Sequence, residues 1–227
     1  MPSRRDVGVV VVAAGQGRRA GGELPKQFRE IGGVPMVLRA VRPFAAHPEV
    51  VEVAVVLPPD VVAAPPAWLG ALRGEGVHLV PGGPARSDSV AAGLAALAPA
   101  CTVVLVHDGA RPFPSRTTID AVIAEARAGR AALAAVPVSD TIKEAAEAGR
   151  LVARTVPRER LWRAQTPQGF PRALLERAHA GRAPGATDDA ALVEAMGEPV
   201  VLVPDDAGNL KVTTEADFIL AEALARR

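Results

Sequence analysis

The sequence predicts an α/β fold with a Rossmann-like, mostly parallel sheet and helices on both of its faces. Apolar stretches of strand length alternate with helical patterns from end to end, which is typical of successive βα units. The stretches are continuous in Val, Leu and Ala, as expected of parallel strands buried on both faces. With 227 residues, 49% of them hydrophobic, the chain is long enough to form one domain with a sizeable core. We therefore expect a single domain over residues 1–227.

Six strands and seven helices account for most of the chain. The strands are expected at Val7–Val12, Glu52–Leu57, Val77–Val80, Thr102–His107, Ala131–Val136 and Val200–Val203. The helices are expected at Val34–Ala46, Pro66–Arg73, Ser87–Leu97, Arg116–Ala128, Pro171–Ala178, Thr187–Met196 and Thr214–Ala225. Two of these helices begin beside residues that cap helices, Asp88 after Ser87 and Thr213 to Glu215.

One segment, residues 137–158, departs from the alternation. Thr141–Lys143 and Leu151–Val156 have β-type composition and flank the polar turn Glu147–Arg150, which indicates a β-hairpin. An isolated two-stranded hairpin is barely stable in water. It therefore either lies on its own domain or packs against another copy of the chain. We favour the second interpretation, a dimerisation arm.

Charge and cysteine content exclude several classes of protein. The formal net charge is +1, so no overall field attracts nucleic acid or an anionic membrane. The single cysteine, Cys101, excludes an intrachain disulfide framework, and its apolar neighbours predict a core position. Arg4 and Arg5 precede an apolar run of about eight residues, but the run leads into glycines and arginines rather than a cleavage site. We expect a soluble, cytoplasmic protein.

A glycine-rich loop follows the first predicted strand. Ala13, Ala14, Gly15 and Gly17 allow backbone N–H groups to approach anionic oxygens closely. Arg19 and Lys26 follow and can neutralise a di- or triphosphate. Because 23 of the 26 basic residues are arginines, the three retained lysines are informative. Lys26 and Lys211 lie in motif-like loops where a compact charge could be needed, whereas Lys143 lies in the arm and could be only a solvated charge.

Other glycine-loop sites fit less well. Gly15, Gly17 and Ala20 match a dinucleotide fingerprint, but no acidic residue stands near the required offset of about 20 positions. The Gly-Lys-Ser/Thr sequence of a P-loop is also missing. A purely structural glycine turn remains an alternative.

Asp108, at the end of the fourth predicted strand, is the candidate metal ligand. The carboxyl ends of parallel strands bind ligands in α/β sheets, and Mg²⁺ binds through one or two carboxylates plus substrate phosphates. Asp108 could instead cap the next turn or pair with Arg111, and His107 is expected to be a packed strand residue. After the third strand, Gly83 and Ser89 could contact a base, whereas Asp88 fits a helix cap as well as a ligand contact.

A second phosphate site is suggested by cations and hydroxyls in the later part of the chain. Arg158 and Lys211, with Thr141 and Thr187, can bind phosphoryl oxygens. Arg111 is a further candidate for binding the substrate. A solvated surface position is the alternative for Arg158.

These motifs together resemble the 2-C-methyl-D-erythritol 4-phosphate cytidylyltransferase family, in order and over nearly the whole chain. The resemblance rests on Ala13-Ala14-Gly15-x-Gly17-x-Arg19, Pro25–Phe28, Gly82-Gly83, Ser87–Val90, Val106–Pro112, Asp140–Lys143, Thr166–Gln168, Thr187-Asp188 and Asn209–Thr213. Sugar-nucleotide pyrophosphorylases share only the first loop.

The resemblance implies a homodimeric, Mg²⁺-dependent enzyme of the non-mevalonate isoprenoid pathway. It would join CTP to methylerythritol phosphate and release pyrophosphate. The family's roles imply that Arg19 and Lys26 stabilise charge on the α-phosphate and that Asp108 holds the metal. Arg158 and Lys211 would position the acceptor phosphate. The resemblance also implies that Thr141 and Thr187 contact the acceptor. It implies that Thr141 and Arg158 enter the partner's site. The implied nucleotide contacts are Ala13, Ala14, Gly15, Gly83 and Ser89.

The sequence departs from the family where many members read the base. Pro84-Ala85 replaces Asp-Glu, and Gly109 replaces an alanine. Two other functions stay open: a cytidylyltransferase acting on ribitol 5-phosphate, and a catalytically silent nucleotide-binding regulator. Lys26, Asp108 and Arg19 are all present, which favours an enzyme over a regulator.

Overall fold

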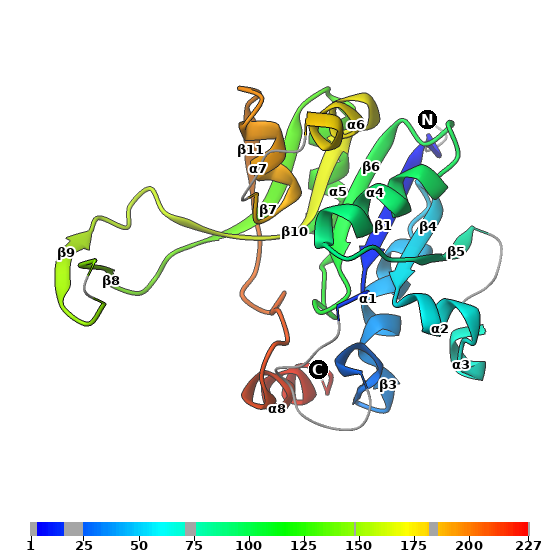
Figure 1. Ribbon diagram of the computed structural model, residues 1–227, viewed down its shortest axis with the longest axis horizontal. Helices are drawn as coiled ribbons and strands as arrows, with labels where there is room; N and C mark the ends of the chain where they lie inside the picture. The colour runs from blue at the N-terminus through cyan, green and yellow to red at the C-terminus, as the bar shows by residue number, and fades with distance from the viewer. Residues whose placement is uncertain (1–3, 16–24, 71–75, 148, 182–185, 227) are drawn as a thin grey trace.

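The computed structural model describes residues 4–15, 25–70, 76–147, 149–181 and 186–226. Its centre is a seven-stranded sheet in the order β11-β7-β10-β6-β1-β4-β5 (Figure 1). β10 pairs antiparallel with β6 and β7, and the other pairings in this sheet are parallel. The strands are β1 (Val7–Val12), β4 (Val50–Leu57), β5 (Val77–Pro81), β6 (Val103–Asp108), β7 (Ala131–Pro137), β10 (Trp162–Pro171) and β11 (Val200–Pro204).

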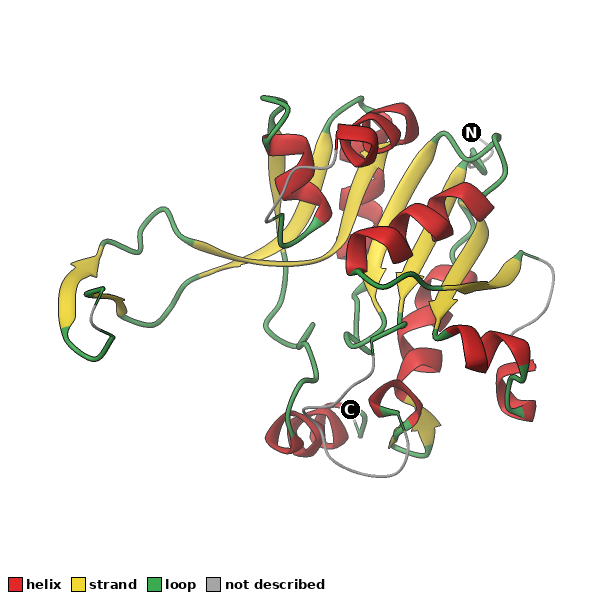
Figure 2. Cartoon of the chain, in the orientation of Figure 1, coloured by secondary structure: helices red, strands yellow, loops and turns green. Residues whose placement is uncertain are grey.

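Helices cover both faces of the sheet (Figure 2). Val9 and Val11 of β1 pack in one core with α1 and α5, whereas Val10 packs in a second core with α4, α6 and α7. Neighbouring residues of a strand point to opposite faces, so the unbroken Val run serves two cores. The helices are η2 (Lys26–Phe28), α1 (Met36–Ala45), α2 (Pro59–Ala63), α3 (Ala67–Gly70), α4 (Arg86–Ala96), α5 (Arg116–Arg127), α6 (Arg172–Gly181), α7 (Asp189–Glu194) and α8 (Glu215–Leu224).

The structure confirms the predicted fold class and the six predicted strands to within two residues at each end. Cys101 is fully buried in the core, as expected. The sequence pattern did not predict η2, α2, the short strands β2 (Glu30–Ile31) and β3 (Val34–Pro35), or β10. The last part of the predicted helix Pro66–Arg73 lies outside the described residues. None of the described helices has the length and hydropathy required to cross a bilayer.

The predicted hairpin is formed by β8 (Ile142–Ala145) and β9 (Val152–Val156). It extends away from the sheet at the end of two long connections from β7 and β10 (Figure 1). Leu151 and Val152 are 72% and 62% exposed in the single chain. The hairpin is therefore confirmed, and its role in dimerisation stays a prediction.

Candidate active site

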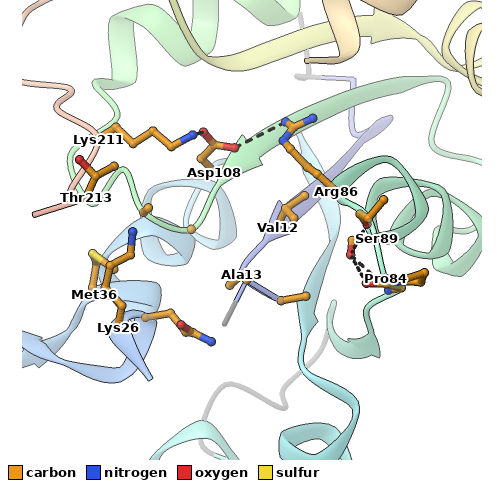
Figure 3. Close-up of a pocket in the computed structure, with 17 residues that line it drawn as sticks. Val12, Ala13, Lys26, Met36, Pro84, Arg86, Ser89, Asp108, Lys211 and Thr213 are labelled. Carbon is orange, nitrogen blue, oxygen red and sulfur yellow. Dashed lines mark hydrogen bonds and ion pairs between the residues drawn. The ribbon is translucent and has the colours of Figure 1, made fainter. Parts of the chain in front are cut away.

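A pocket of about 460 Å³ lies where β1 and β6 end (Figure 3). The chain leaves β1 through Ala13, whose N–H donates to the Val56 carbonyl at 2.7 Å, and it leaves β6 through Gly109, whose N–H donates to the Val12 carbonyl at 2.9 Å. These bonds hold both strand exits at one edge of the sheet. The predicted site residues that line the pocket are Ala13, Ala14, Gly15, Lys26, Gly83, Ser89, Asp108 and Lys211.

The glycine pair after β5 forms one wall of the pocket. A Cβ at Gly82 would lie 2.4 Å from the Ala14 Cβ, so the close approach of the two loops requires glycine there. The Gly83 N–H donates to the Ser89 hydroxyl oxygen at 3.2 Å, and the hydroxyl donates to the Ala85 carbonyl at 3.1 Å. Asp88 accepts from the Ala85 N–H at 3.1 Å in the first turn of α4, which supports the capping interpretation.

The two lysines come from distant parts of the chain. Lys26, the first residue of η2, donates from Nζ to the Val212 carbonyl at 2.7 Å. Lys211 lies in the segment leading to α8, and the Val212 N–H donates to the Ala110 carbonyl at 2.8 Å. The segment around residue 211 is thus fixed to both η2 and the end of β6. Both lysines line the pocket as a result.

The Asp108 carboxylate lies among cations. Its Oδ2 is 2.8 Å from Lys211 Nζ, and its Oδ1 is 3.5 Å from Arg86 Nη2 (Figure 3). Burial alone raises the pKa of this carboxyl, but the positive charges of Lys211 and Arg86 outweigh that effect and lower the pKa to about 2. Asp108 is therefore ionised throughout the neutral range.

A buried chain of hydrogen bonds holds the backbone of Asp108. The Asp108 N–H donates to Thr166 Oγ1 at 3.0 Å, and Thr166 Oγ1 lies 3.0 Å from His107 Nδ1. His107 Nε2 lies 2.9 Å from the Arg111 carbonyl, which can only accept. Burial lowers the pKa of His107 to about 4. The ring is therefore neutral, with its proton on Nε2 and its Nδ1 accepting from Thr166, as expected of a packed strand residue.

Arg111 acts as a support for the lysine segment. Its Nη1 donates to the Asn209 carbonyl at 2.7 Å, and its Nε lies 3.9 Å from Asp108 Oδ2. Asn209 Nδ2 donates to the Thr166 carbonyl at 2.8 Å. Arg111 is 8% exposed and is not among the residues that line the pocket. From the sequence, pairing with Arg111 was an alternative to ligand binding by Asp108. In the structure Asp108 does both things: it pairs with Arg111 and it lines the pocket.

The other candidates lie elsewhere or outside the described residues. Thr141 and Arg158 flank the hairpin, where Arg158 donates to the Ser139 carbonyl, and neither lines the pocket of its own chain. Thr187 is exposed, one residue before the Asp188 cap of α7. Within one chain, none of these three residues is among those that line the pocket with Lys211. Gly17 and Arg19 lie outside the described residues.

Arg86 also lines the pocket and was given no role by the sequence analysis. It is the first residue of α4 and follows the glycine pair by three positions. That placement, a cation at a helix start beside the predicted ligand edge, is the signal that could have identified it. Met36, Gln27 and Thr213 complete the wall nearest η2 without such a signal.

The carboxylate content of the pocket limits the metal it can hold. Within the described ranges no group of three or more His, Cys, Asp or Glu side chains could hold a metal ion. Asp108 is the one acidic residue among the described residues that line the pocket. A single ionised carboxylate fits a magnesium ion whose remaining ligands are phosphate oxygens and water.

Comparison with known proteins gives a consistent match. The family model described as "2-C-methyl-D-erythritol 4-phosphate cytidylyltransferase" (IspD) matches residues 7–227. A protein of that name from Frankia casuarinae is 44% identical over 222 residues, covering 97% of this chain and 82% of its own. A bifunctional IspD/IspF enzyme from Anaeromyxobacter dehalogenans is 48% identical over 95% of this chain, which spans 56% of that relative. The crystal structure of the cytidylyltransferase from Thermus thermophilus superposes with a TM-score of 0.79 at 39% identity, covering 96% of this chain and 98% of that one.

Proposed function

The chain belongs to the 2-C-methyl-D-erythritol 4-phosphate cytidylyltransferase family, and we propose that the pocket at the ends of β1 and β6 is where it carries out the family's reaction. The enzyme transfers a cytidylyl group from CTP to 2-C-methyl-D-erythritol 4-phosphate in the isoprenoid pathway. The convergence of Lys26, Asp108 and Lys211 on one pocket supports this choice of site.

The chemistry needs positioning and charge stabilisation rather than a general base. An anionic oxygen of the acceptor phosphate attacks the α-phosphorus of CTP, and a new phosphorus–oxygen bond forms. The bond from the α-phosphorus to the bridging oxygen breaks, and pyrophosphate leaves with the electron pair. Lys26, together with Arg19, neutralises the charge that develops on the α-phosphate. Lys211 holds the acceptor phosphate in line with the leaving group.

Asp108 would hold the magnesium ion on the triphosphate. When bound there, the ion would neutralise phosphate charge and orient the leaving group. The Asp108 carboxylate is ionised because the charges of Lys211 and Arg86 lower its pKa, so it is ready to bind a cation without losing a proton. Lys211 lies 2.8 Å from the same carboxylate, and it can turn toward the acceptor phosphate.

The complete site is proposed to form in a homodimer. Thr141 and Arg158 flank a hairpin that extends away from the pocket of its own chain (Figure 1). An arm exchanged between two copies would place these residues at the neighbouring pocket and would cover Leu151 and Val152. The single cysteine suits a reducing compartment, and the enzyme is proposed to act in the cytoplasm.

Cytosine recognition is proposed to depend on the backbone near Gly83. Pro84 and Ala85 line the pocket and provide no side-chain donor or acceptor. The Gly83 N–H already donates to Ser89. The Gly83 carbonyl lies 3.5 Å from the same hydroxyl and has a second lone pair that can accept from the cytosine amino group. Uracil has no amino group at that position, so this single contact favours CTP over UTP.

Pyrophosphate release with Mg²⁺ tests the function directly. CTP with methylerythritol 4-phosphate is compared with ribitol 5-phosphate as acceptor and with ATP, GTP and UTP as donors. We expect release with CTP and methylerythritol phosphate to exceed every other pair. Preference for ribitol phosphate would keep the mechanism and change the pathway, and no release with any pair would support a silent nucleotide-binding protein.

A further inference from the structure

The Arg86 guanidinium lies between the carboxylates of Asp189 and Asp108, and Figure 3 shows it beside Asp108 at the edge of the pocket. Its Nη1 donates to Asp189 Oδ2 at 2.7 Å, and its Nη2 lies 3.5 Å from Asp108 Oδ1. The first contact is a strong ion pair, whereas the second is at the limit of a hydrogen bond. Asp189 therefore anchors Arg86, and Asp108 is only its neighbour.

The anchor itself is rigid. Asp189 is 1% exposed, and its other oxygen, Oδ1, lies 3.0 Å from His179 Nε2 on α6. Asp189 begins α7, whose Asp188 cap accepts from the Ala191 N–H at 2.9 Å. Because the carboxylate is held from both sides, the guanidinium is fixed before any ligand binds. A fixed cation loses less side-chain entropy on binding than a free one.

Arg86 keeps donors for a ligand. A guanidinium has five N–H donors, and its contacts to Asp189 and Asp108 use two of them. The side chain is 31% exposed and lines the pocket. A guanidinium does not lose its proton in proteins, so the group is positive.

The location of Arg86 indicates which anion it meets. Its neighbour Asp108 is also paired with Lys211, at 2.8 Å, and Lys211 is assigned to the acceptor phosphate. Arg86 and Lys211 therefore contact the same carboxylate, one from α4 and the other from the segment before α8.

We propose that Arg86 is a further binding residue of the pocket and donates hydrogen bonds to the phosphate of the acceptor. This inference rests on the proposed function, because it assumes an acceptor that carries a phosphate monoester. The alternative is that Arg86 only ties α4 to α7 through Asp189.

Steady-state kinetics and calorimetry of the full-length protein distinguish the ligand-binding role of Arg86 from the purely structural one. We expect Arg86→Gln to raise KM for methylerythritol phosphate about 10- to 100-fold, the range for a lost charge-assisted hydrogen bond, with KM for CTP changed less than about twofold. The inhibition constant of inorganic phosphate, used as a competitor of the acceptor, should rise by a similar factor. Arg86→Lys should recover part of the loss.

Two further variants supply controls. Arg172→Gln removes a similarly anchored arginine that donates to the Ala98 carbonyl at 2.6 Å and does not line the pocket; it should leave both KM values unchanged. Asp189→Asn keeps the guanidinium and should raise the acceptor KM less than Arg86→Gln. If Asp189→Asn matched Arg86→Gln, or if phosphate binding were unaltered in folded Arg86→Gln, the inference would be wrong. Calorimetric binding of inorganic phosphate needs no turnover, so it tests Arg86 even if the proposed acceptor fails in the wild type.

Discussion

Lys211 Nζ lies 2.8 Å from Asp108 Oδ2, so the cation assigned to the acceptor phosphate is paired with the carboxylate assigned to the metal. The two residues are far apart in the sequence and come together because Val212 and Asn209 are hydrogen-bonded to the end of β6 and to β10. A metal ion at Asp108 would change the electrostatic surroundings of Lys211, and a phosphate at Lys211 would change those of Asp108. With these proposed roles, we expect metal binding and acceptor binding to be coupled through this ion pair.

Lys211→Met should lower kcat/KM for the acceptor more than kcat/KM for the nucleotide. The variant removes a cation from the phosphate and leaves Asp108 without its nearest positive partner. We expect kcat/KM for methylerythritol phosphate to fall by about 100-fold, with a smaller change for CTP. Arg130→Met, which removes an exposed arginine paired with Glu125, is the control. Equal losses for both substrates would contradict the assigned role.

Lys26→Ala should lower turnover far more than CTP affinity. Its charge is assigned to the transition state, where negative charge accumulates on the α-phosphate. We expect kcat to fall by about 100-fold or more, while the Kd for CTP, measured by calorimetry without acceptor, rises only severalfold. Parallel changes in Kd and kcat would show that Lys26 binds the ground state equally well.

Thr166→Val should destabilise the protein and disturb Asp108. The substitution keeps the side-chain shape but leaves the Asp108 N–H and His107 Nδ1 without their partner. Each buried unsatisfied group costs about 1–3 kcal/mol. Urea unfolding should show a loss of about 2–6 kcal/mol for the two groups, and kcat should fall because the backbone of Asp108 is no longer held. Thr166→Ser retains the hydroxyl and should recover kcat; failure to do so would argue against the hydrogen-bond chain.

Mixed dimers test the shared site. If Arg158 serves the pocket of the other chain, a dimer of one Lys26→Ala chain and one Arg158→Ala chain contains one intact site. Random exchange of equal amounts should then restore about one quarter of wild-type activity. The measurement is pyrophosphate release after subunit exchange has been verified by differently tagged chains. No recovery after verified exchange would place Arg158 in the site of its own chain. Sedimentation of the wild-type protein as a monomer would show that the proposed dimer is wrong.

Asp217 should give α8 an acid-sensitive cap. Partial burial raises its pKa, but hydrogen bonds from Thr213 and Thr214 outweigh that effect and lower the pKa to about 2. Since the folded value is below the ordinary value of 3.8, the ionised group stabilises the fold above about pH 4, and this contribution is lost as pH falls through 2. Asp217→Asn should lower the unfolding free energy by about 1 kcal/mol at pH 7. Chemical unfolding at several pH values should show this difference shrinking between about pH 4 and 2; a constant difference would contradict it.

The strand-and-helix order was predictable because buried parallel strands have a strong local signal. The Val run of β1 and the apolar runs of β4, β6 and β7 were each located to within two residues. β10 gave no such signal. Its centre, Gln165-Thr166-Pro167-Gln168, has the polar composition of a loop. The three polar side chains are buried and bond to distant groups, such as Gln168 Nε2 to Asp188 Oδ2 at 2.8 Å.

The sequence alone determined the fold class, the glycine-rich strand exit at Gly15, and the chemical character of Lys26, Asp108 and Lys211, since these depend on residue type and local pattern. Only the tertiary structure decided that the three converge on one pocket, that Lys211 pairs with Asp108, and that Arg86 joins them from α4. It also placed Thr141 and Arg158 away from that pocket within one chain. The physical reason is that hydrophobic periodicity acts over a few residues, whereas ion pairs and buried hydrogen bonds join residues that only the complete sheet brings together.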